Sequence, residues 1–293
     1  MPFIVTLISG PGRLTPAIGT MAMEAIGASA IDWLAEKTAC EFGLPEGTDA
    51  TAAEVHLREA LAADPVDIVV QPATGRRRNI LIADMDSTMI DQECIDELAD
   101  EIGMKDHIAA ITRRAMNGEI AFEPALRERV LLLKGLPVSV ISKVLDERIT
   151  LAAGGRELIA TMKKNGAHTA LVSGGFTAFT GAVAERLGFD ENIANRLLEE
   201  GGKLAGKVAE PILGRQAKAD ALMKIAARLS LTPADAMAVG DGANDLDMIQ
   251  LAGSGVALHA KPSVAAQARI RIDHGDLTAL LYIQGYRQSE FAR

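Results

Sequence analysis

Three short apolar segments, each ending in a polar residue, constrain the fold of this chain more than any other feature. They are ILIAD (80–84), HTALVS (168–173) and AMAVGD (236–241), and fainter segments of the same kind follow at 255–258 and 269–273. Stretches with helical spacing lie between most of them. Alternating strands and helices are typical of a parallel sheet with helices on both faces. We therefore expect an α/β fold built on a Rossmann-like parallel sheet.

The polar residues that end these segments are Asp84, Ser173 and Asp241. In open α/β sheets, ligands bind at the carboxyl ends of the strands. Three separate segments follow this rule, so the sequence predicts a functional site at that edge of the sheet.

Residues 85–167 separate the first apolar segment from the second. A simple crossover between parallel strands needs only about a dozen residues. The excess contains several helical patterns, which predict a helical cap inserted at about 91–150. Caps of this kind exclude water from reactions that water would spoil.

The first 75 residues predict a separate, small α+β module. Strand-like segments at 2–9 and 66–71 flank two stretches with helical spacing, and residues 72–79 read as a linker with Pro, Gly and three arginines. We expect residues 1–75 to form this module and 79–293 to form the catalytic domain. The module could be a degenerate ACT-like regulatory domain, and a structural or dimerising role, giving a homodimer, is equally compatible.

Charge and cysteine content exclude several classes of protein. The net charge of −9 argues against a general nucleic-acid or anionic-membrane binder, whose surface should be basic. Two cysteines, Cys40 and Cys94, make neither a disulfide framework nor a zinc cluster. The N-terminus lacks the basic start of a signal peptide, and no stretch has the roughly 18 apolar residues of a membrane span. We expect a cytoplasmic protein with no nucleic-acid or membrane partner.

Asp84 and Asp86 form the first acidic cluster. Side chains at i and i+2 of an extended segment share one side, and two carboxylates there repel unless a cation or a proton lies between them. An EF-hand loop would need Gly where Met89 stands. The remaining alternatives are a solvated turn and a metal site. The segment AVGDGANDLDM (238–248) adds Asp241 and Asp245, and so supplies the third carboxylate that a Mg²⁺ site needs.

The turn Ser173-Gly174-Gly175 offers a hydroxyl and backbone N–H groups, which is a common way to hold phosphate. Taken alone it could be a plain turn, and Lys218 alone would be a solvated surface lysine. Together with the carboxylates, these groups describe a phosphoryl-transfer site with a carboxylate nucleophile.

The whole set of motifs resembles the haloacid dehalogenase superfamily. The motifs are D-x-D-S-T at 84–88, S-G-G at 173–175, a lysine at 218 and G-D-G-x-N-D at 240–245. The cap segments DQECIDELA (91–99) and MNGEIAFEPALRERVLLLKGL (116–136) resemble those of the phosphoserine phosphatases within it. Matching stretches extend over roughly residues 79–285.

The resemblance implies a role for each group. Asp84 would be the nucleophile and form an aspartyl-phosphate, and Asp86 would be the general acid and base. Mg²⁺ would be held by Asp84, the backbone carbonyl of Asp86 and Asp241, with Asp245 in support. The residues implied to hold the phosphate are Ser173, Gly174, Lys218 and Asn244.

The resemblance also implies a substrate, phosphoserine, with Glu93 facing its ammonium and Arg129 its carboxylate. Rival functions are a phosphotransferase that passes the phosphoryl group to another alcohol, and a non-catalytic amino-acid sensor.

The sequence pattern supports Arg129 but not Glu93. Arg129 falls on the apolar stripe of its helix, with Phe122 and Leu126, so it needs a partner. A substrate carboxylate would serve, and the alternatives are a buried ion pair or an arginine whose stem alone is buried. Glu93 lies beside Asp96, Glu97 and Asp100, where the pattern favours a solvated face.

Overall fold

The computed structural model describes residues 2–117 and 119–292. Internal contacts divide the chain into two compact units. The first unit comprises Met1–Arg78, Ala153–Gly166 and Ile270–Arg293, and the second comprises Asn79–Ala152 and Ala167–Arg269. The functional division expected from the sequence, with a module of residues 1–75 and a catalytic domain of 79–293, stays a prediction.

The N-terminal part of the first unit is a small α+β module, as predicted. Its elements follow the ferredoxin-like order β-α-β-β-α-β, and its antiparallel sheet has the strand order β2-β3-β1-β4. The elements are β1 (Phe3–Ile8), α1 (Pro16–Ala25), β2 (Asp32–Ala35), β3 (Ala39–Gly43), α2 (Ala50–Ala60) and β4 (Asp67–Pro72).

Both helices of this module begin at a side-chain cap. The Thr15 hydroxyl accepts from the Ile18 N–H, and the Asp49 carboxylate accepts from the Ala52 N–H at 2.7 Å. Such caps satisfy N–H groups that the first helical turn leaves without partners. Alternate strand residues and one face of each helix then bury a common core, which includes Val5, Leu7, Ala22, Cys40, Phe42 and Leu57.

Later parts of the chain complete the first unit: α7 (Gly155–Lys164), β12 (Ile270–Ile272) and α12 (Ala279–Ile283). The carboxylate of Asp67 accepts from the backbone N–H groups of 273, 274 and 275. Gln71 donates to the Ile283 carbonyl at 2.6 Å. The C-terminal segment is therefore hydrogen-bonded to β4.

Two arginines of the expected linker are also bound to this unit. Arg76 pairs with Glu41 at 2.6 Å, and the Arg77 guanidinium lies 3.9 Å from the centre of the Tyr286 ring. This end of the 72–79 segment is held in place rather than left as a free linker.

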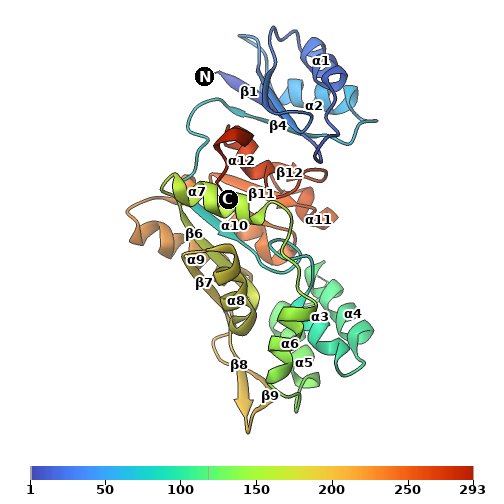
Figure 1. The fold of residues 1–293 in the computed structure, drawn as a ribbon, viewed down its shortest axis with the longest axis vertical. Helices are drawn as coiled ribbons and strands as arrows, with labels where there is room; N and C mark the ends of the chain where they lie inside the picture. Colours follow the sequence, from blue (N-terminus) through green and yellow to red (C-terminus); the bar gives the residue numbers. More distant parts are fainter. Residues whose placement is uncertain (1, 118, 293) are drawn as a thin grey trace. The chain divides into compact units, whose positions relative to one another are not determined.

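The second unit contains the predicted parallel sheet (Figure 1). Its strands are β5 (Ile80–Ala83), β6 (His168–Phe176), β7 (Glu191–Asn195), β10 (Ala236–Gly240) and β11 (Ser254–Leu258), in the order β11-β10-β5-β6-β7. Every residue of β5 and β10 is buried. Strands covered on both faces read as continuous apolar runs, which is why these segments were recognisable in the sequence.

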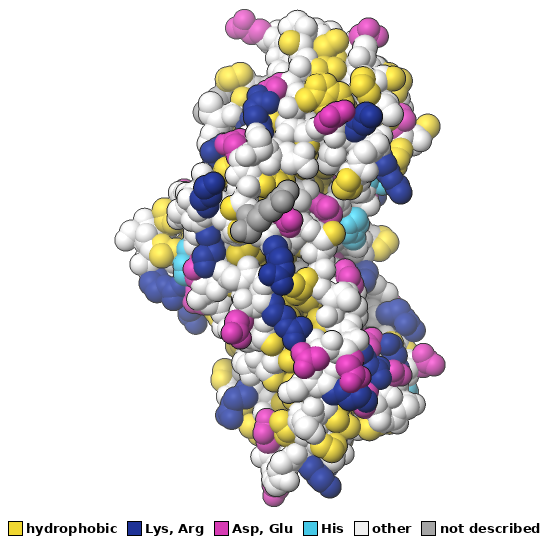
Figure 2. All heavy atoms as spheres, viewed as in Figure 1, with side chains coloured by type: hydrophobic (Ala, Val, Ile, Leu, Met, Phe, Trp, Pro, Cys, Tyr) yellow, Lys and Arg dark blue, Asp and Glu magenta, His cyan; other side chains and the backbone are white. Residues whose placement is uncertain are grey.

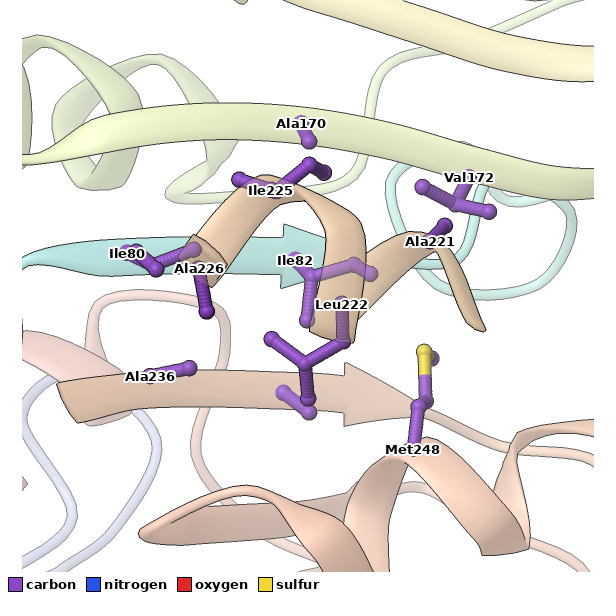
Figure 3. Packing of buried hydrophobic residues seen from close by; sticks show 11 residues of the cluster. Ile80, Ile82, Ala170, Val172, Ala221, Leu222, Ile225, Ala226, Ala236 and Met248 are labelled. Carbon is purple, nitrogen blue, oxygen red and sulfur yellow. The ribbon is translucent and has the colours of Figure 1, made fainter. Parts of the chain in front are cut away.

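Helix α9 (Arg215–Arg228) packs on this sheet, as Figure 3 shows. Its side chains Ala221, Leu222, Ile225 and Ala226 contact strand residues that include Ile80, Ile82, Ala170, Val172 and Ala236. The remaining helices of the unit outside the cap are α8 (Thr177–Leu187), α10 (Leu246–Leu251) and α11 (Pro262–Ala265).

Four helices between β5 and β6 form the predicted cap: α3 (Cys94–Asp100), α4 (Lys105–Met116), α5 (Phe122–Leu132) and α6 (Ser139–Glu147). Arg148 and Lys143 both pair with Glu101, at 2.7 and 3.0 Å. Figure 2 shows charged side chains of both signs close together where Figure 1 places these helices. The cap surface is thus mixed in charge on the face shown.

A hairpin that the sequence did not predict joins the cap. It consists of β8 (Leu197–Glu200) and β9 (Lys203–Val208), between β7 and α9. The Gly135 N–H donates to the Leu204 carbonyl, and the Leu204 N–H donates to the Leu136 carbonyl, both at 2.9 Å. The hairpin therefore holds the cap where α5 ends.

Within residues 2–117 and 119–292, no helix has the length and apolar character needed to cross a membrane.

Candidate active site

Three buried carboxylates meet at the carboxyl ends of two neighbouring strands. Asp84 follows β5, and Asp241 and Asp245 follow β10. Each contributes one oxygen to a group whose atoms lie within 4.8 Å of one another. The side chains are 3%, 1% and 0% exposed. The sequence-predicted residues thus come together, although their segments lie far apart in the chain.

Lys218 bridges two of these carboxylates. Its Nζ lies 2.7 Å from Asp84 Oδ1 and 2.6 Å from Asp245 Oδ1. Burial alone would lower the pKa of Lys218, but Asp245 and Asp84 raise it above its ordinary value. Read alone, the sequence suggested a solvated lysine, and this was wrong. The available signal was the spacing from Lys218 to Leu222 and Ile225, which places all three on the buried face of α9.

Asp241 has the properties of a metal ligand. Both of its carboxylate oxygens, and the side-chain oxygen of Asn244, are buried and accept no hydrogen bond from the described residues. The nearest cation is Lys261, whose Nζ lies 3.4 Å from Oδ2. Burial and then the charge of Asp245 raise the pKa of Asp241 to about 7. Clustered, buried oxygens without hydrogen-bond partners fit a hard divalent cation such as Mg²⁺.

We expect Mg²⁺ to stabilise the protein more as the pH rises. Because the pKa of Asp241 is raised from 3.8 to about 7, the metal-free folded protein keeps a proton that the unfolded chain releases. The free energy of unfolding in EDTA should therefore fall from about pH 4 to about pH 7. Mg²⁺ needs the ionised carboxylate, so the increase in Tm that it causes should grow over this range and then level off.

The measurement is thermal unfolding at several pH values, in EDTA and in excess Mg²⁺. A concentration about 100-fold above Kd corresponds to roughly 2.7 kcal/mol, or about 5–10 °C at neutral pH. A Tm increase that is the same at acidic and neutral pH would contradict a site containing Asp241. Ca²⁺ and Na⁺ at equal ionic strength serve as controls.

Asp86 has different partners from Asp84. Its Oδ1 accepts from the Cys94 N–H at 2.8 Å, and its Oδ2 accepts from the Ser173 hydroxyl at 3.2 Å. Burial raises its pKa, as it does that of Asp84, and a raised pKa favours the protonated form that a general acid needs. Asp84 instead bonds to Lys218. Two neighbouring carboxyl groups with different surroundings can perform different chemical roles.

Ser173, Gly174 and Gly175 lie within β6 and not in the turn expected from the sequence, and this segment is tightly enclosed. The Gly175 N–H donates to the Ser173 hydroxyl at 2.8 Å. A Cβ at Gly174 would lie 2.8 Å from the ring of Phe122, the first residue of α5, and one at Gly175 would lie 2.9 Å from Asp86 Oδ2. A larger residue at either position would therefore displace the ring of Phe122 or the carboxyl group of Asp86.

Glu93 lies in the wall of the pocket, and the sequence pattern that favoured a solvated face misplaced it. Glu93 is the N-cap residue that precedes α3. It therefore does not lie on the helical face that carries Asp96 and Asp100. Its Oε1 accepts from the Ser87 hydroxyl at 2.8 Å, and Ser87 adopts a left-handed φ of 55°. Burial and the charge of Asp86 raise the pKa of Glu93 well above its usual range.

Arg129 is a buried cation, only 5% exposed. Its Nε donates to the Ala125 carbonyl at 3.1 Å and its Nη1 to the Thr112 hydroxyl at 3.0 Å. No carboxylate of the described residues forms an ion pair with it. Burial lowers its pKa, and the more distant charges of Glu93 and Asp96 oppose this. Within the described chain, neither an internal ion pair nor an exposed head group explains this arginine.

One pocket collects most of the residues predicted from the sequence. Its polar lining includes Asp84, Asp86, Glu93, Arg129, Ser173, Gly174 and Asn244, and its apolar lining includes Ile95, Phe122 and Leu126. Lys218, Asp241 and Asp245 are not in the lining, but Lys218 bonds to Asp84, and the carboxylates of Asp241 and Asp245 lie within 4.8 Å of that of Asp84. Sequence reasoning missed Thr112, which also lines the pocket.

A family model described as haloacid dehalogenase-like hydrolase matches residues 81–250, more than half of the chain. The chain belongs to the haloacid dehalogenase-like hydrolases. The matched range begins at β5 and ends in α10, so it includes every residue of the acidic cluster.

A curated phosphatase is similar to this chain in sequence. A phosphoserine phosphatase from Archaeoglobus fulgidus is 43% identical over 215 residues, which are 73% of this chain. The match spans 62% of that relative, less than two thirds of its length.

Two solved structures are similar to this fold. A hydrolase of the family from Salmonella enterica serovar Typhi has a TM-score of 0.85 at 31% identity, covering 96% of this chain and 98% of its own. A structure described as a phospho-aspartyl intermediate analogue of phosphoserine phosphatase has a TM-score of 0.67 at 41% identity. It covers 70% of this chain and 98% of its own.

Proposed function

We propose that this chain is a Mg²⁺-dependent phosphatase that hydrolyses O-phospho-L-serine to L-serine and phosphate. The observation that carries the proposal is Arg129, a buried guanidinium without an ion-pair partner among the described residues, in the pocket of Asp84 and Asp86. A buried, uncompensated charge is costly unless a ligand supplies its partner. The phosphoserine phosphatases among the relatives support the same substrate.

The charged groups of phosphoserine correspond to groups in the pocket. Arg129 can bind the carboxylate through two parallel hydrogen bonds, and Glu93 can accept from the ammonium. The phosphate would be bound by Ser173, the Gly174 backbone, Asn244 and Lys218. A phosphomonoester without an amino-acid part would offer neither an anion to Arg129 nor a cation to Glu93.

The chain's own residues can carry out both halves of the reaction. Asp84 attacks phosphorus, the bond from phosphorus to the serine oxygen breaks, and protonated Asp86 donates its proton to that oxygen. Asp86, now a carboxylate, takes a proton from the water that attacks the aspartyl-phosphate. This step releases phosphate and regenerates Asp84. A bound Mg²⁺, held by Asp84, Asp241 and the backbone carbonyl of Asp86 with Asp245 in support, would supply positive charge against the phosphoryl oxygens.

The test is steady-state kinetics of wild type and Arg129→Ala on phosphoserine and on p-nitrophenyl phosphate, following free phosphate. A charge-assisted hydrogen bond is worth roughly 1.5–3 kcal/mol, so kcat/KM for phosphoserine should fall by about 10–100-fold. The aryl phosphate has no carboxylate and should lose far less. Arg129→Lys should restore activity only in part, because a point charge cannot form the planar fork.

Arg127 on the same helix provides the matched control. It is half-exposed and pairs with Glu123, so Arg127→Ala should leave both activities unchanged. Equal losses on both substrates in Arg129→Ala would mean that Arg129 is structural. Transfer of phosphate to an added alcohol, in place of its release, would favour the phosphotransferase alternative.

For residues 1–75 we propose a regulatory role, with a structural or dimerising role as the alternative; their elements follow the ferredoxin-like order. We further propose that the enzyme serves serine biosynthesis in the cytoplasm. Inhibition by serine tests the first point without altering the chain. Inhibition that is non-competitive with phosphoserine would indicate a second site, and purely competitive inhibition would mean that serine acts only as a product.

A further inference from the structure

Thr112 in α4 connects Arg129 to a carboxylate of the cap. Its hydroxyl oxygen accepts from Arg129 Nη1 at 3.0 Å and lies 3.0 Å from Asp96 Oδ1. The same oxygen lies 3.1 Å from the Ile108 carbonyl, so its single proton goes to one of these two acceptors. Thr112 is 4% exposed and lines the pocket.

This arrangement keeps the arginine from pairing directly with Asp96. A direct pair with the Asp96 carboxylate would occupy two N–H groups of the guanidinium. The carboxylate of a substrate needs two such N–H groups for a bidentate bond. The hydroxyl instead holds one edge of the guanidinium through Nη1, while the Ala125 carbonyl holds Nε. No described residue accepts from Nη2.

We propose that Thr112 is a positioning residue for substrate specificity, because it orients Arg129 so that the arginine binds the carboxylate of the substrate. The inference rests on the function proposed above and adds a residue that does not itself need to touch the substrate. Its effect should be confined to ligands that carry a carboxylate.

A purely structural threonine would behave differently. Ser and Thr in helices often bond to the carbonyl four residues earlier, as Thr112 does with Ile108. If the bond to Ile108 were the whole role of Thr112, removing the hydroxyl would change the stability of the protein but not its preference among substrates. The test must therefore compare substrates within one variant.

The experiment compares wild type, Thr112→Val and Thr112→Ser on phosphoserine, O-phosphoethanolamine and p-nitrophenyl phosphate. Val keeps the shape but lacks the hydroxyl, and a hydrogen bond to a charged group is worth about a tenfold change. We expect KM for phosphoserine to rise about tenfold in Thr112→Val, with kcat within about twofold. The two substrates without a carboxylate should be unaffected, and Thr112→Ser should restore the wild-type preference.

A double-variant cycle separates positioning from general damage. In an Arg129→Ala background, Thr112→Val should cause no further loss on phosphoserine. If Thr112→Val does not fold, Thr112→Ala takes its place in both comparisons.

Two outcomes overturn different statements. A wild type that does not prefer phosphoserine to O-phosphoethanolamine overturns the proposed function, and this inference with it. A selective wild type whose preference survives in Thr112→Val overturns the inference alone.

Discussion

Asp84→Asn is expected to abolish turnover, by roughly 10⁴-fold or more, without unfolding the protein. The amide is neutral and cannot form the acyl-phosphate, so the first chemical step is lost. Its oxygen can still accept from Lys218 and from the Met85 N–H, as Asp84 Oδ1 does at 2.7 and 2.8 Å. The measurements are phosphate release and trapping of the phosphoenzyme with radiolabelled substrate, and both should be at background.

The thermal stability of Asp84→Asn serves as a control, because it shows whether the loss of activity comes from unfolding. The substitution removes one of the two carboxylates that pair with Lys218, but Asp245 still pairs with this lysine, so in EDTA the variant should remain folded. The increase in Tm caused by Mg²⁺ should shrink, because one ligand is weakened. Wild-type turnover in Asp84→Asn would show that another group is the nucleophile.

Asp86→Asn is expected to slow the reaction by about 10²–10⁴-fold, the usual contribution of a general acid or base. The nucleophile and its bond to Lys218 remain. The asparagine oxygen can still accept from the Cys94 N–H, so the loop geometry should persist. Beryllium fluoride, which mimics a phosphoryl group on a carboxylate, should therefore still bind to Asp84.

The choice of substrate sharpens this second prediction. p-Nitrophenolate leaves without needing a proton, so formation of the phosphoenzyme from p-nitrophenyl phosphate should be much less impaired than formation from phosphoserine. A burst of p-nitrophenol followed by slow hydrolysis would be the expected rapid-mixing result. Equal impairment of both substrates in the first step would argue against Asp86 as the acid.

Much of the fold could be predicted because its central strands are buried on both faces. The continuous apolar runs at 80–84 and 236–241 predicted two strands, and the structure has β5 and β10 at these positions. The β8–β9 hairpin gave no such signal, because its short strands, LLEE and KLAGKV, mix charged and apolar residues and form no continuous apolar run. Its bonds to 135 and 136 are contacts between distant segments that no local pattern records.

The residues of the candidate active site also differ in how well the sequence pattern predicted them. Asp84 and Asp241 were found because a strand end fixes where a side chain lies. Arg129 was found because a charge interrupts an apolar stripe. Glu93 was misplaced because a helical pattern was applied to a residue outside the helix. The bonds from Lys218 to Asp84 and from Thr112 to Arg129 depend on how helices pack, which spacing alone does not show.

The division of the chain into two units affects the order in which they can fold during synthesis. The first unit draws on residues 1–78, 153–166 and 270–293, so the chain passes between the units at 78/79, 152/153, 166/167 and 269/270. During synthesis, domains generally fold as their residues emerge, from the N-terminus onward. Here residues 1–78 emerge before the second unit, yet Asp67 and Gln71 can meet their partners at 273–275 and 283 only after the second unit has been synthesised. The last residue of the second unit is Arg269, so this unit, which holds the candidate active site, can fold before the first unit has all of its residues.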